Sequence, residues 1–257
     1  MQTPLIRQPR KHEVFIMVTV PIQRSTTVAL SLQQALWPQL EATASNLANG
    51  STGGFKRVLV DTKEVKQTST DGQIVSYTYA SNITRDFSDG AVKQTENPLD
   101  VAISGPGFFQ VSGGQLTRNG QFSINQSGQL ITTDGQTVLG DGGEVNIPSS
   151  AKYIKIASDG TISTDQGKIG KIGIFTVEDE KSLNYGANGY YTGGGNITAL
   201  NKPKVLQGFV EESNVQPITE TIKLMDILRT FEYAQKIIED QAKQQSQVIN
   251  ASSRNAI

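Results

Sequence analysis

The sequence contains no cysteine, which excludes disulfides, thiolate catalysis and cysteine-ligated metals and leaves the redox compartment undetermined. Charged residues make up only 18% of the 257 positions, and 23 Lys+Arg against 24 Asp+Glu leave a net charge of −1. This balance argues against a global field directed at nucleic acid or an anionic membrane. No run approaches the length of apolar sequence that a membrane-spanning helix needs, so we expect no membrane insertion.

Signatures of enzymes are also scarce. His12 is the only histidine, and a Ser-His-Asp arrangement would have to use this residue of an expected flexible segment. Gly105 and Gly107 lack the third glycine of a dinucleotide-binding loop. Glu211 and Glu212 could in principle serve a glycosidase, but nothing organises a substrate cleft around them. We therefore expect no enzyme activity: no catalytic residue, no cofactor, no metal ion and no small-molecule substrate.

Residues 1–24 are expected to form a flexible leader. Basic residues precede the apolar run 14–20, as they do in a secretion signal. The run is at the lower length limit of such signals, and Pro21 follows where a small-residue cleavage site should lie. A cleaved signal is therefore the alternative reading, and Met17 is a candidate for the true start.

Apolar periodicity predicts a helix at each end of the chain. Between about Ser25 and Asn49 the apolar positions recur every three or four residues, with Pro38 expected to kink or break the helix. A second helix is predicted from about Ile218 to Asn250. Its heptad seam consists of Leu224, Leu228, Phe231, Gln235, Ile238, Ala242, Gln245 and Ile249. Because each stripe has to be buried, we expect residues 25–54 and 214–257 to form one coiled-coil domain.

Residues 55–213 are predicted to form a central, mainly antiparallel β domain, which makes the fold class mixed α and β. Short stretches of β-branched and aromatic residues alternate there with Asp-Gly and Ser-Gly turn signals. The clearest hairpin joins 153–157 to 161–164, where Asp159 and Gly160 are expected to supply positive backbone angles. A second hairpin is predicted to join 122–125 to 129–132.

The helical stripes leave two interpretations open. Two paired helices cannot cover all their apolar surface, and the remainder would suit a filament of identical or related subunits. A helical hairpin on a single β domain, as in a soluble binding module, explains the same pattern equally well.

Three stretches resemble the flagellar rod and hook proteins. Residues 44–56 resemble the signature at the end of the family's first helix, residues 97–111 and 117–122 its central motif, and residues 208–217 the segment before its last helix. They occur in family order, and with the helices they span about residues 25–250. The compact middle most resembles proximal rod subunits, with distal rod subunits as the near alternative. Ser45 departs from the family's asparagine, and Pro38 falls where its helix usually continues.

The resemblance implies a structural subunit of the basal-body rod, which assembles into the helical drive shaft that transmits torque from motor to hook. The implied partners are other rod subunits, copies of the same chain and the flagellar export apparatus. The implied location is the rod where it crosses the periplasm.

Residues of these motifs and of the last helix are expected to have structural or assembly roles rather than ligands. They are Asn46, Leu47, Asn49, Gly54, Phe55, Asp100, Gly105, Gly107, Phe108, Phe109, Ser213, Asn214, Leu224, Leu228, Phe231 and Ile238. The asparagines are expected to bond backbone groups at turns and helix ends, and the glycines to let the chain turn beside buried rings.

Overall fold

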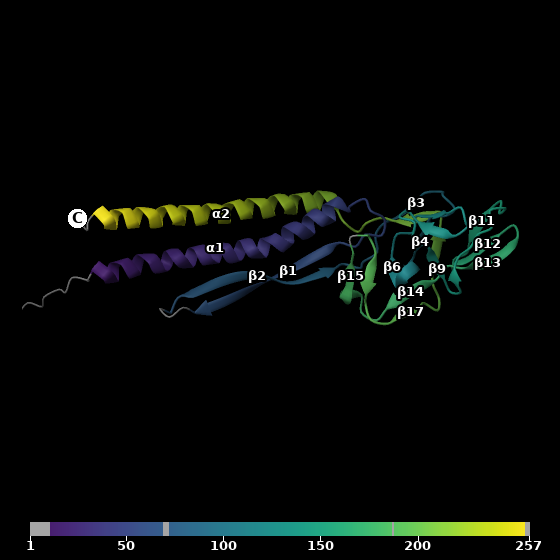
Figure 1. The fold of residues 1–257 in the computed structure, drawn as a ribbon, viewed down its shortest axis with the longest axis horizontal. Coiled ribbons are helices and arrows are strands. Elements are labelled where there is room, and N and C mark those ends of the chain that lie inside the picture. The colour runs from purple at the N-terminus through teal and green to yellow at the C-terminus, as the bar shows by residue number, and fades with distance from the viewer. Residues whose placement is uncertain (1–10, 69–71, 187, 255–257) are drawn as a thin grey trace, which may run out of the picture. The chain divides into compact units, whose positions relative to one another are not determined.

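The fold is mixed α and β, as predicted, with a long helix at each end and antiparallel strands between them (Figure 1). The computed structural model describes residues 11–68, 72–186 and 188–254, with side chains from residue 25 to residue 251. The helices are α1 (Lys11–Ala48) and α2 (Pro217–Arg254), and two 3-10 turns are η1 (Ser112–Gly114) and η2 (Glu180–Ser182). Within these ranges, neither helix combines the length and apolarity needed to cross a membrane.

The strands are short except for the first two. They are β1 (Val58–Thr68), β2 (Ile74–Arg85), β3 (Val92–Gln94), β4 (Val101–Ile103), β5 (Phe108–Val111), β6 (Gln115–Thr117), β7 (Phe122–Ile124), β8 (Leu130–Thr132), β9 (Val138–Gly140), β10 (Gly143–Glu144), β11 (Ile154–Ile156), β12 (Thr161–Thr164), β13 (Gly167–Lys171), β14 (Ile174–Val177), β15 (Leu183–Tyr185), β16 (Tyr191–Gly193), β17 (Ile197–Ala199), β18 (Val205–Gln207) and β19 (Phe209–Glu211).

The chain divides into two compact units. Within the described residues, the helical unit comprises 11–44, 59–68, 72–83 and 218–254, and the β unit comprises 45–58, 84–186 and 188–217. The predicted domain bounds differ from this division, since they place 59–83 with the β domain and 45–54 with the helices. The β1–β2 pair belongs with the helices because an isolated two-stranded sheet needs a further surface to bury its side chains. A groove lined by Val28 of α1, Ile74 of β2 and Ile237 of α2 shows that the three elements meet.

Helix α1 is longer than expected. It begins at Lys11 rather than near Ser25, so residues 11–24 of the expected flexible leader continue the helix, while residues 1–10 lie outside the described residues. The break expected at Pro38 is not observed. Proline leaves the carbonyl four residues earlier without its helical donor. That residue, Gln34, is exposed, so water can replace the lost hydrogen bond.

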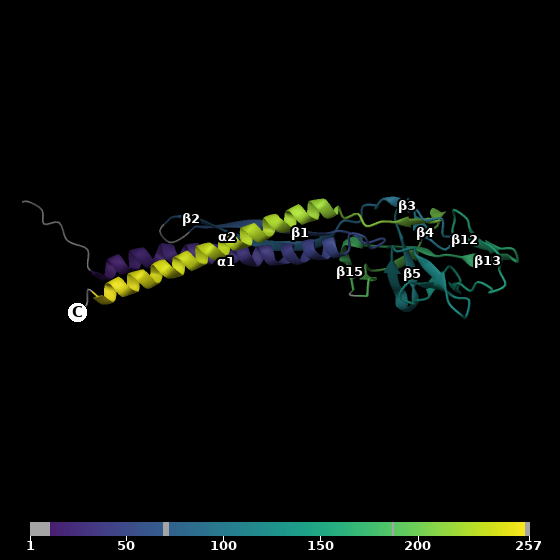
Figure 2. The ribbon, with the colours of Figure 1, turned by 90° about the horizontal axis from the view of Figure 1, so that it is seen from above.

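The two helices lie side by side in the helical unit (Figures 1 and 2). Gln33 Nε2 of α1 donates a hydrogen bond to Gln235 Oε1 of α2 at 3.0 Å. The most buried residue of α2 beyond its first turn is Ala234, whereas Gln235 of the predicted seam is exposed and Leu228 is 44% exposed. The fully or partly buried positions Ile227, Phe231, Ala234, Ile238 and Gln241 also step by four and three, so the buried stripe has heptad spacing but a different register from the predicted seam.

The recorded strand pairs of the β unit are all antiparallel, as predicted. Its largest sheet has the order β10-β9-β5-β6-β16-β15, and β14 links β5 to β17. Strands β11, β12 and β13 form a three-stranded sheet, and the pairs β18–β4, β19–β3 and β7–β8 complete the unit.

Both predicted hairpins are confirmed. Strand β7 pairs with β8, and β11 pairs with β12. The loop between β11 and β12 differs in detail from the expectation, because Gly160 has a positive φ, of 88°, whereas Asp159 does not. The backbone N–H of Gly160 donates to the carbonyl of Ala157 at 2.9 Å and closes the turn.

Neighbouring phenylalanines of β5 enter two different hydrophobic clusters. Phe109 packs in the larger cluster with Val101, Phe122 and Ile174, whereas Phe108 packs with residues that include Tyr191. Successive strand residues point to opposite faces, so this pair anchors the sheet on both sides.

Candidate functional site

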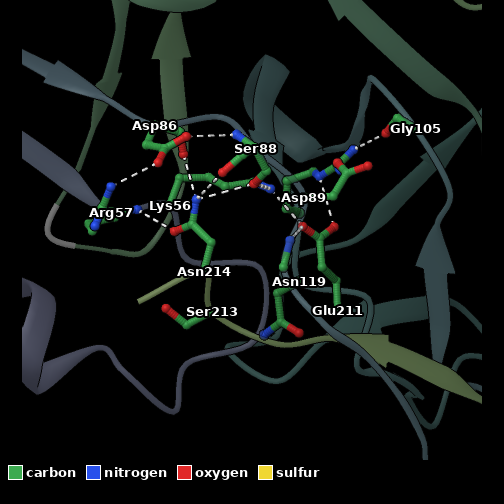
Figure 3. A network of polar contacts seen from close by, with 12 residues as sticks. Lys56, Arg57, Asp86, Ser88, Asp89, Gly105, Asn119, Glu211, Ser213 and Asn214 are labelled. Carbon is green, nitrogen blue, oxygen red and sulfur yellow. Dashed lines mark hydrogen bonds and ion pairs between the residues drawn. The ribbon is translucent and has the colours of Figure 1, made fainter. Parts of the chain in front are cut away.

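The three motifs of the sequence meet within the β unit, at a place that we call the junction (Figure 3). It comprises Asn46, Lys56, Arg57, Arg85, Asp86, Ser88, Asp89, Arg118, Glu211 and Asn214. All of these residues belong to the β unit, although they come from distant parts of the chain. The junction therefore joins the segment that ends α1, the central motif and the segment that leads to α2.

Asn46, in the last turn of α1, binds the backbone at the start of β1. Its Oδ1 accepts a hydrogen bond from Val58 N at 2.7 Å, and its Nδ2 donates to Val58 O at 2.9 Å. One side-chain amide thus satisfies both backbone groups of a residue, as a neighbouring strand would. Because Asn46 is buried, removing its amide would leave backbone groups without partners.

Asn214 binds Arg57, the residue before Val58, and also the segment 86–88. Its Oδ1 accepts a hydrogen bond from Arg57 N at 2.7 Å, and its Nδ2 donates to Asp86 O at 2.8 Å and to Ser88 O at 3.1 Å. Arg57 and Asp86 are also joined directly, because Asp86 N donates to Arg57 O at 2.9 Å and their side chains form an ion pair at 3.2 Å. Asn214 therefore holds together the two chain segments that enter and leave the β1–β2 pair.

A buried ion cluster forms the centre of the junction. Lys56 Nζ lies 2.6 Å from Glu211 Oε1, and Arg118 Nε lies 3.0 Å from Glu211 Oε2. The side chains of Lys56 and Glu211 are each 1% exposed, and that of Arg118 is 3% exposed. Asp89, which is 57% exposed, accepts a bond from Arg118 at 2.8 Å and balances the second cation. Burial is tolerated because every charge in the cluster has an opposite partner.

Burial also acts on the titration of Lys56. It lowers the pKa of this amine below the ordinary 10.5, whereas the hydrogen bond to Glu211 acts in the opposite sense. Lys56 Nζ donates a further hydrogen bond to Ser88 O at 2.7 Å. The amine thus donates hydrogen bonds to two acceptors, the carboxylate of Glu211 and the carbonyl of Ser88.

The guanidinium of Arg118 holds the central glycine turn. It donates to the carbonyl of Gly105 at 2.8 Å and to that of Gly107 at 2.5 Å. Gly107 has φ 124°, and a Cβ there would lie 2.7 Å from Ile174 Cγ2. Only glycine fits this position without strain. The turn precedes Phe108 and Phe109, so the junction is continuous with both hydrophobic clusters.

Arg85 occupies a cage of aromatic rings beside the junction. Its guanidinium carbon lies 4.6 Å from the ring centre of Tyr185, 5.5 Å from that of Phe55 and 5.9 Å from that of Tyr191. A cation at these distances is attracted by the ring faces. Arg85 Nη1 also donates to Lys56 O at 2.9 Å, which fixes the end of β2 to the residue that precedes β1 by two positions.

Gly54 explains the tight approach of the first motif to the central motif. Its φ is 67°, and an added Cβ would lie 2.4 Å from the backbone carbonyl carbon of Arg118. The neighbouring Phe55 is 1% exposed. The glycine therefore permits the close contact that buries the ring of Phe55.

Several predicted residues lie near the junction without belonging to it. Asn49 binds within its own helix end, where Nδ2 donates to Ser45 O at 2.9 Å and Oδ1 accepts from Thr52 at 3.2 Å. Asp100 accepts a bond from Asn97 Nδ2 at 3.0 Å. Leu47 is partly buried, and Ser213 Oγ accepts from Val215 N at 3.2 Å.

Four further predicted residues are not at the junction. Leu224, Leu228, Phe231 and Ile238 belong to α2 in the helical unit. Apart from Leu228 they are partly buried.

Sequence reasoning missed the charged members of the junction. Lys56 and Arg118 lie inside the motif segments without a predicted role, Glu211 was considered only as a possible glycosidase carboxylate, and the segment 85–89 was not singled out. The available signal was that charged residues occur inside motifs otherwise made of turn-forming and apolar residues. Glu211 and Glu212 do not form a catalytic pair: Glu211 is neutralised by buried cations, whereas Glu212 is exposed and lies 3.6 Å from Lys93. The arrangement suits positioning, because its buried charges are paired with one another, although Arg118 Nε and Glu211 Oε2 form an ion pair without a hydrogen bond.

Comparisons with known proteins match the central part of the β unit, its C-terminal end and the last helix. The family model described as "Flagellar hook protein FlgE/F/G D1 domain" matches residues 102–164. The model described as "Flagellar basal body rod FlgEFG protein C-terminal" matches residues 206–253. The second match includes the Glu211 and Asn214 side of the junction and most of α2.

Curated relatives are similar over most of the chain. The flagellar basal-body rod protein FlgF of Caulobacter vibrioides is 33% identical, over 84% of this chain and 92% of its own length. FlgF of Mesorhizobium japonicum is 31% identical, over 89% of this chain and 97% of its own length. The flagellar basal-body rod protein FlgG of Bacillus subtilis is 31% identical, over 84% and 94% respectively.

Proposed function

Because the chain belongs to the flagellar basal-body rod protein family, whose FlgF-type and FlgG-type members are both among its relatives, we propose that it is a proximal rod subunit of the FlgF type. It is a structural component of the flagellar basal body. As a subunit it assembles with copies of itself and with other rod subunits into the helical shaft that carries torque from motor to hook. It acts without enzyme activity, cofactor or metal.

The geometry of the junction is the structural observation that supports this proposal. Asn46 lies in the last turn of α1, and Asn214 lies shortly before Pro217, where α2 begins. Both asparagines bind the same short stretch of backbone, residues 57–58. The inner ends of both helices are thus tied to one compact β unit. A subunit of a rotating shaft needs such a connection, since torque applied to its helices has to reach the rest of the molecule.

The helices supply surfaces for assembly. Ile218 is 79% exposed and Ile222 is 56% exposed, and Met225 continues the same side of α2 at helical spacing. On α1, Trp37 is also exposed. Exposed apolar side chains in a row are costly in an isolated chain and favour burial against other subunits. We propose that these surfaces form coiled-coil contacts in the assembled rod.

The proposed location is the part of the rod that crosses the periplasm, reached through the flagellar export apparatus without removal of a signal. The basal-body names of the relatives support the basal body itself. The route and the position along the rod are part of the proposal.

Incorporation into basal bodies tests the function. A chain truncated before Met225 lacks most of α2, so we expect a strain that carries only this form to build no complete rod and to be non-motile. The double variant Ile218→Asp and Ile222→Asp tests the surface without shortening the chain. Lys236→Ala and Lys243→Ala on the same helix are the matched control. Normal swimming by the truncated or the aspartate form would overturn the proposal.

The distal rod subunit is the second candidate, because FlgG relatives have similar identity. Labelling the chain in isolated basal bodies distinguishes the two. A label near the membrane-proximal end of the rod supports the proximal assignment, and a label near the hook supports the distal one.

A further inference from the structure

The outer face of the β11–β13 sheet displays unpaired lysines. Lys155 lies opposite Ser163, and Ser163 lies opposite Lys168, so the three side chains share one face. Ile156 and Ile162 are buried on the other face. Lys155 and Lys168 are exposed, and neither forms an ion pair within the described part of the chain. We call Lys155, Ser163 and Lys168 the basic face.

Neighbouring residues reinforce this positive charge. Lys152 and Lys204 are exposed close by, since Lys152 precedes β11 and the residue after Lys204 bonds to Ser158 in the β11–β12 turn. The nearby carboxylates accept hydrogen bonds from neighbouring backbone N–H groups. Asp159 Oδ1 accepts from Thr161 N at 3.1 Å, and Asp165 Oδ1 accepts from Lys152 N at 3.0 Å. The four lysines outnumber these two carboxylates, so the face has an excess of positive charge.

A turn of opposite charge follows β14. Glu178 and Asp179 are exposed, and Glu180 begins the 3-10 turn η2. Glu180 also lines a cavity of about 280 Å3, together with Phe87, Pro106 and other residues. We call Glu178, Asp179 and Glu180 the acidic turn. Lys181 is the one basic residue among its immediate neighbours in the sequence.

The basic face and the acidic turn lie toward opposite ends of the β unit. In both views of the ribbon, β12 and β13 lie at one end of the unit, and β15, which follows the acidic turn, lies near the other (Figures 1 and 2). A rigid body with complementary patches at two ends can add copies head to tail. Such contacts do not close on themselves, so they extend into a chain of molecules.

We propose that the β units of successive copies stack end to end, with the basic face of one copy against the acidic turn of the next. The inference rests on the proposed function, because it names the orientation in which copies of a rod subunit meet. Complementary charge at such a contact sets direction and rate of encounter more than total affinity. It also makes the contact sensitive to salt, since exposed charges are screened beyond about 8 Å at physiological ionic strength.

Two charge-reversal variants of the full chain test the orientation. Lys155→Glu with Lys168→Glu makes both ends of the β unit acidic, and Glu178→Lys with Glu180→Lys makes both ends basic. We expect each variant alone to self-associate at least about tenfold more weakly than the unaltered chain in sedimentation at low salt. We expect an equimolar mixture of the two variants to recover association, because unlike ends then meet.

The matched control is Lys63→Glu with Lys66→Glu, which changes the net charge equally on exposed positions of β1. It should associate like the unaltered chain. Thermal unfolding of each variant shows that it is folded. A mixture that associates no better than either variant alone overturns the inference, as does an unaltered chain without salt-sensitive association.

A cysteine pair gives a second readout in this cysteine-free chain. Ser163→Cys lies in the basic face, and Lys181→Cys lies beside the acidic turn. The double variant should form a ladder of disulfide-linked oligomers at low salt, whereas high salt should abolish it. A chain that enters basal bodies but gives no ladder and no mixture recovery would contradict only the stacking. Failure to enter basal bodies would contradict the proposed function itself.

Discussion

The ammonium of Lys56 lies 2.6 Å from the carboxylate of Glu211, although 155 positions separate them in the sequence. Both side chains are almost completely buried. The pair joins the segment before β1, where the first motif ends, to β19, which precedes the segment that leads into α2. The pair therefore stabilises the β unit at the place where the segment that follows α1 meets the segment that precedes α2.

Removal of Glu211 is expected to destabilise the β unit strongly. Glu211→Ala leaves Lys56 and Arg118 buried without their shared carboxylate, which costs about 3–5 kcal/mol of unfolding free energy. Chemical denaturation measures the change. The control is Glu212→Ala, whose exposed ion pair should contribute less than about 1 kcal/mol. Equal losses in the two variants would show that the buried cluster is not stabilising.

Asn46 and Asn214 are expected to protect the backbone that they bind. Asn46→Ala removes both partners of Val58, and Asn214→Ala removes the partner of Arg57 N; each should cost about 1–3 kcal/mol. Hydrogen exchange of the amides at residues 57 and 58 should accelerate in these variants. Asn188→Ala, which removes an exposed side-chain bond to Gln115, serves as the control. Unchanged protection at residues 57–58 would count against the role assigned to the two asparagines.

Gly54→Ala is expected to disturb the contact between the first and central motifs. The added Cβ would lie 2.4 Å from the carbonyl carbon of Arg118, at a φ of 67° that alanine rarely adopts. We expect a loss of at least about 1–2 kcal/mol in unfolding free energy, since strain and overpacking both act. Gly142→Ala, with open space around its Cβ and no positive φ, should be close to neutral. A small effect at Gly54 would mean that the backbone there can shift freely.

Alkaline pH is expected to lower stability through Tyr191. Burial raises the pKa of this phenol above its ordinary value of 10.0. Above pH 10 the unfolded chain releases the proton while the folded chain retains it, so stability falls as pH rises, by up to about 1.4 kcal/mol per pH unit. Below pH 10 both states are protonated and this contribution is constant. Tyr191→Phe should therefore show a shallower decline between pH 10 and 11 than the unaltered chain, and an identical slope would contradict the prediction.

Glu96 offers a stabilising substitution. Among the described residues other than glycine it alone has a positive φ, of 63°. Its backbone N–H donates to Gly208 O at 3.3 Å, which helps to hold this conformation. Glu96→Gly relieves the left-handed strain and is expected to raise the unfolding free energy by about 0.5–1 kcal/mol. A thermal denaturation curve that shifts downward would show that the side chain contributes more than the strain costs.

Local patterns were sufficient where neighbours in sequence decide the structure. The hairpins around Ser127-Gly128 and Asp159-Gly160 form because a turn residue stands between short strands, and both could be predicted. The continuity of α1 through Pro38 could not be predicted, because the effect of this proline depends on whether solvent reaches the carbonyl of Gln34. Likewise, the placement of 59–83 with the helices depends on which surface is available to cover a two-stranded sheet.

The sequence by itself determined the helices at both ends, the antiparallel middle and, through its motifs, the rod family. These follow from periodicity, turn residues and short stretches read in order. Only the tertiary structure decided that Asn46, Lys56, Arg118, Glu211 and Asn214 form one junction, and that Leu228 is exposed while Ala234 is buried. Long-range pairing of charges and amides depends on how distant segments pack, and buried polar groups accept only the partners that the packing places beside them.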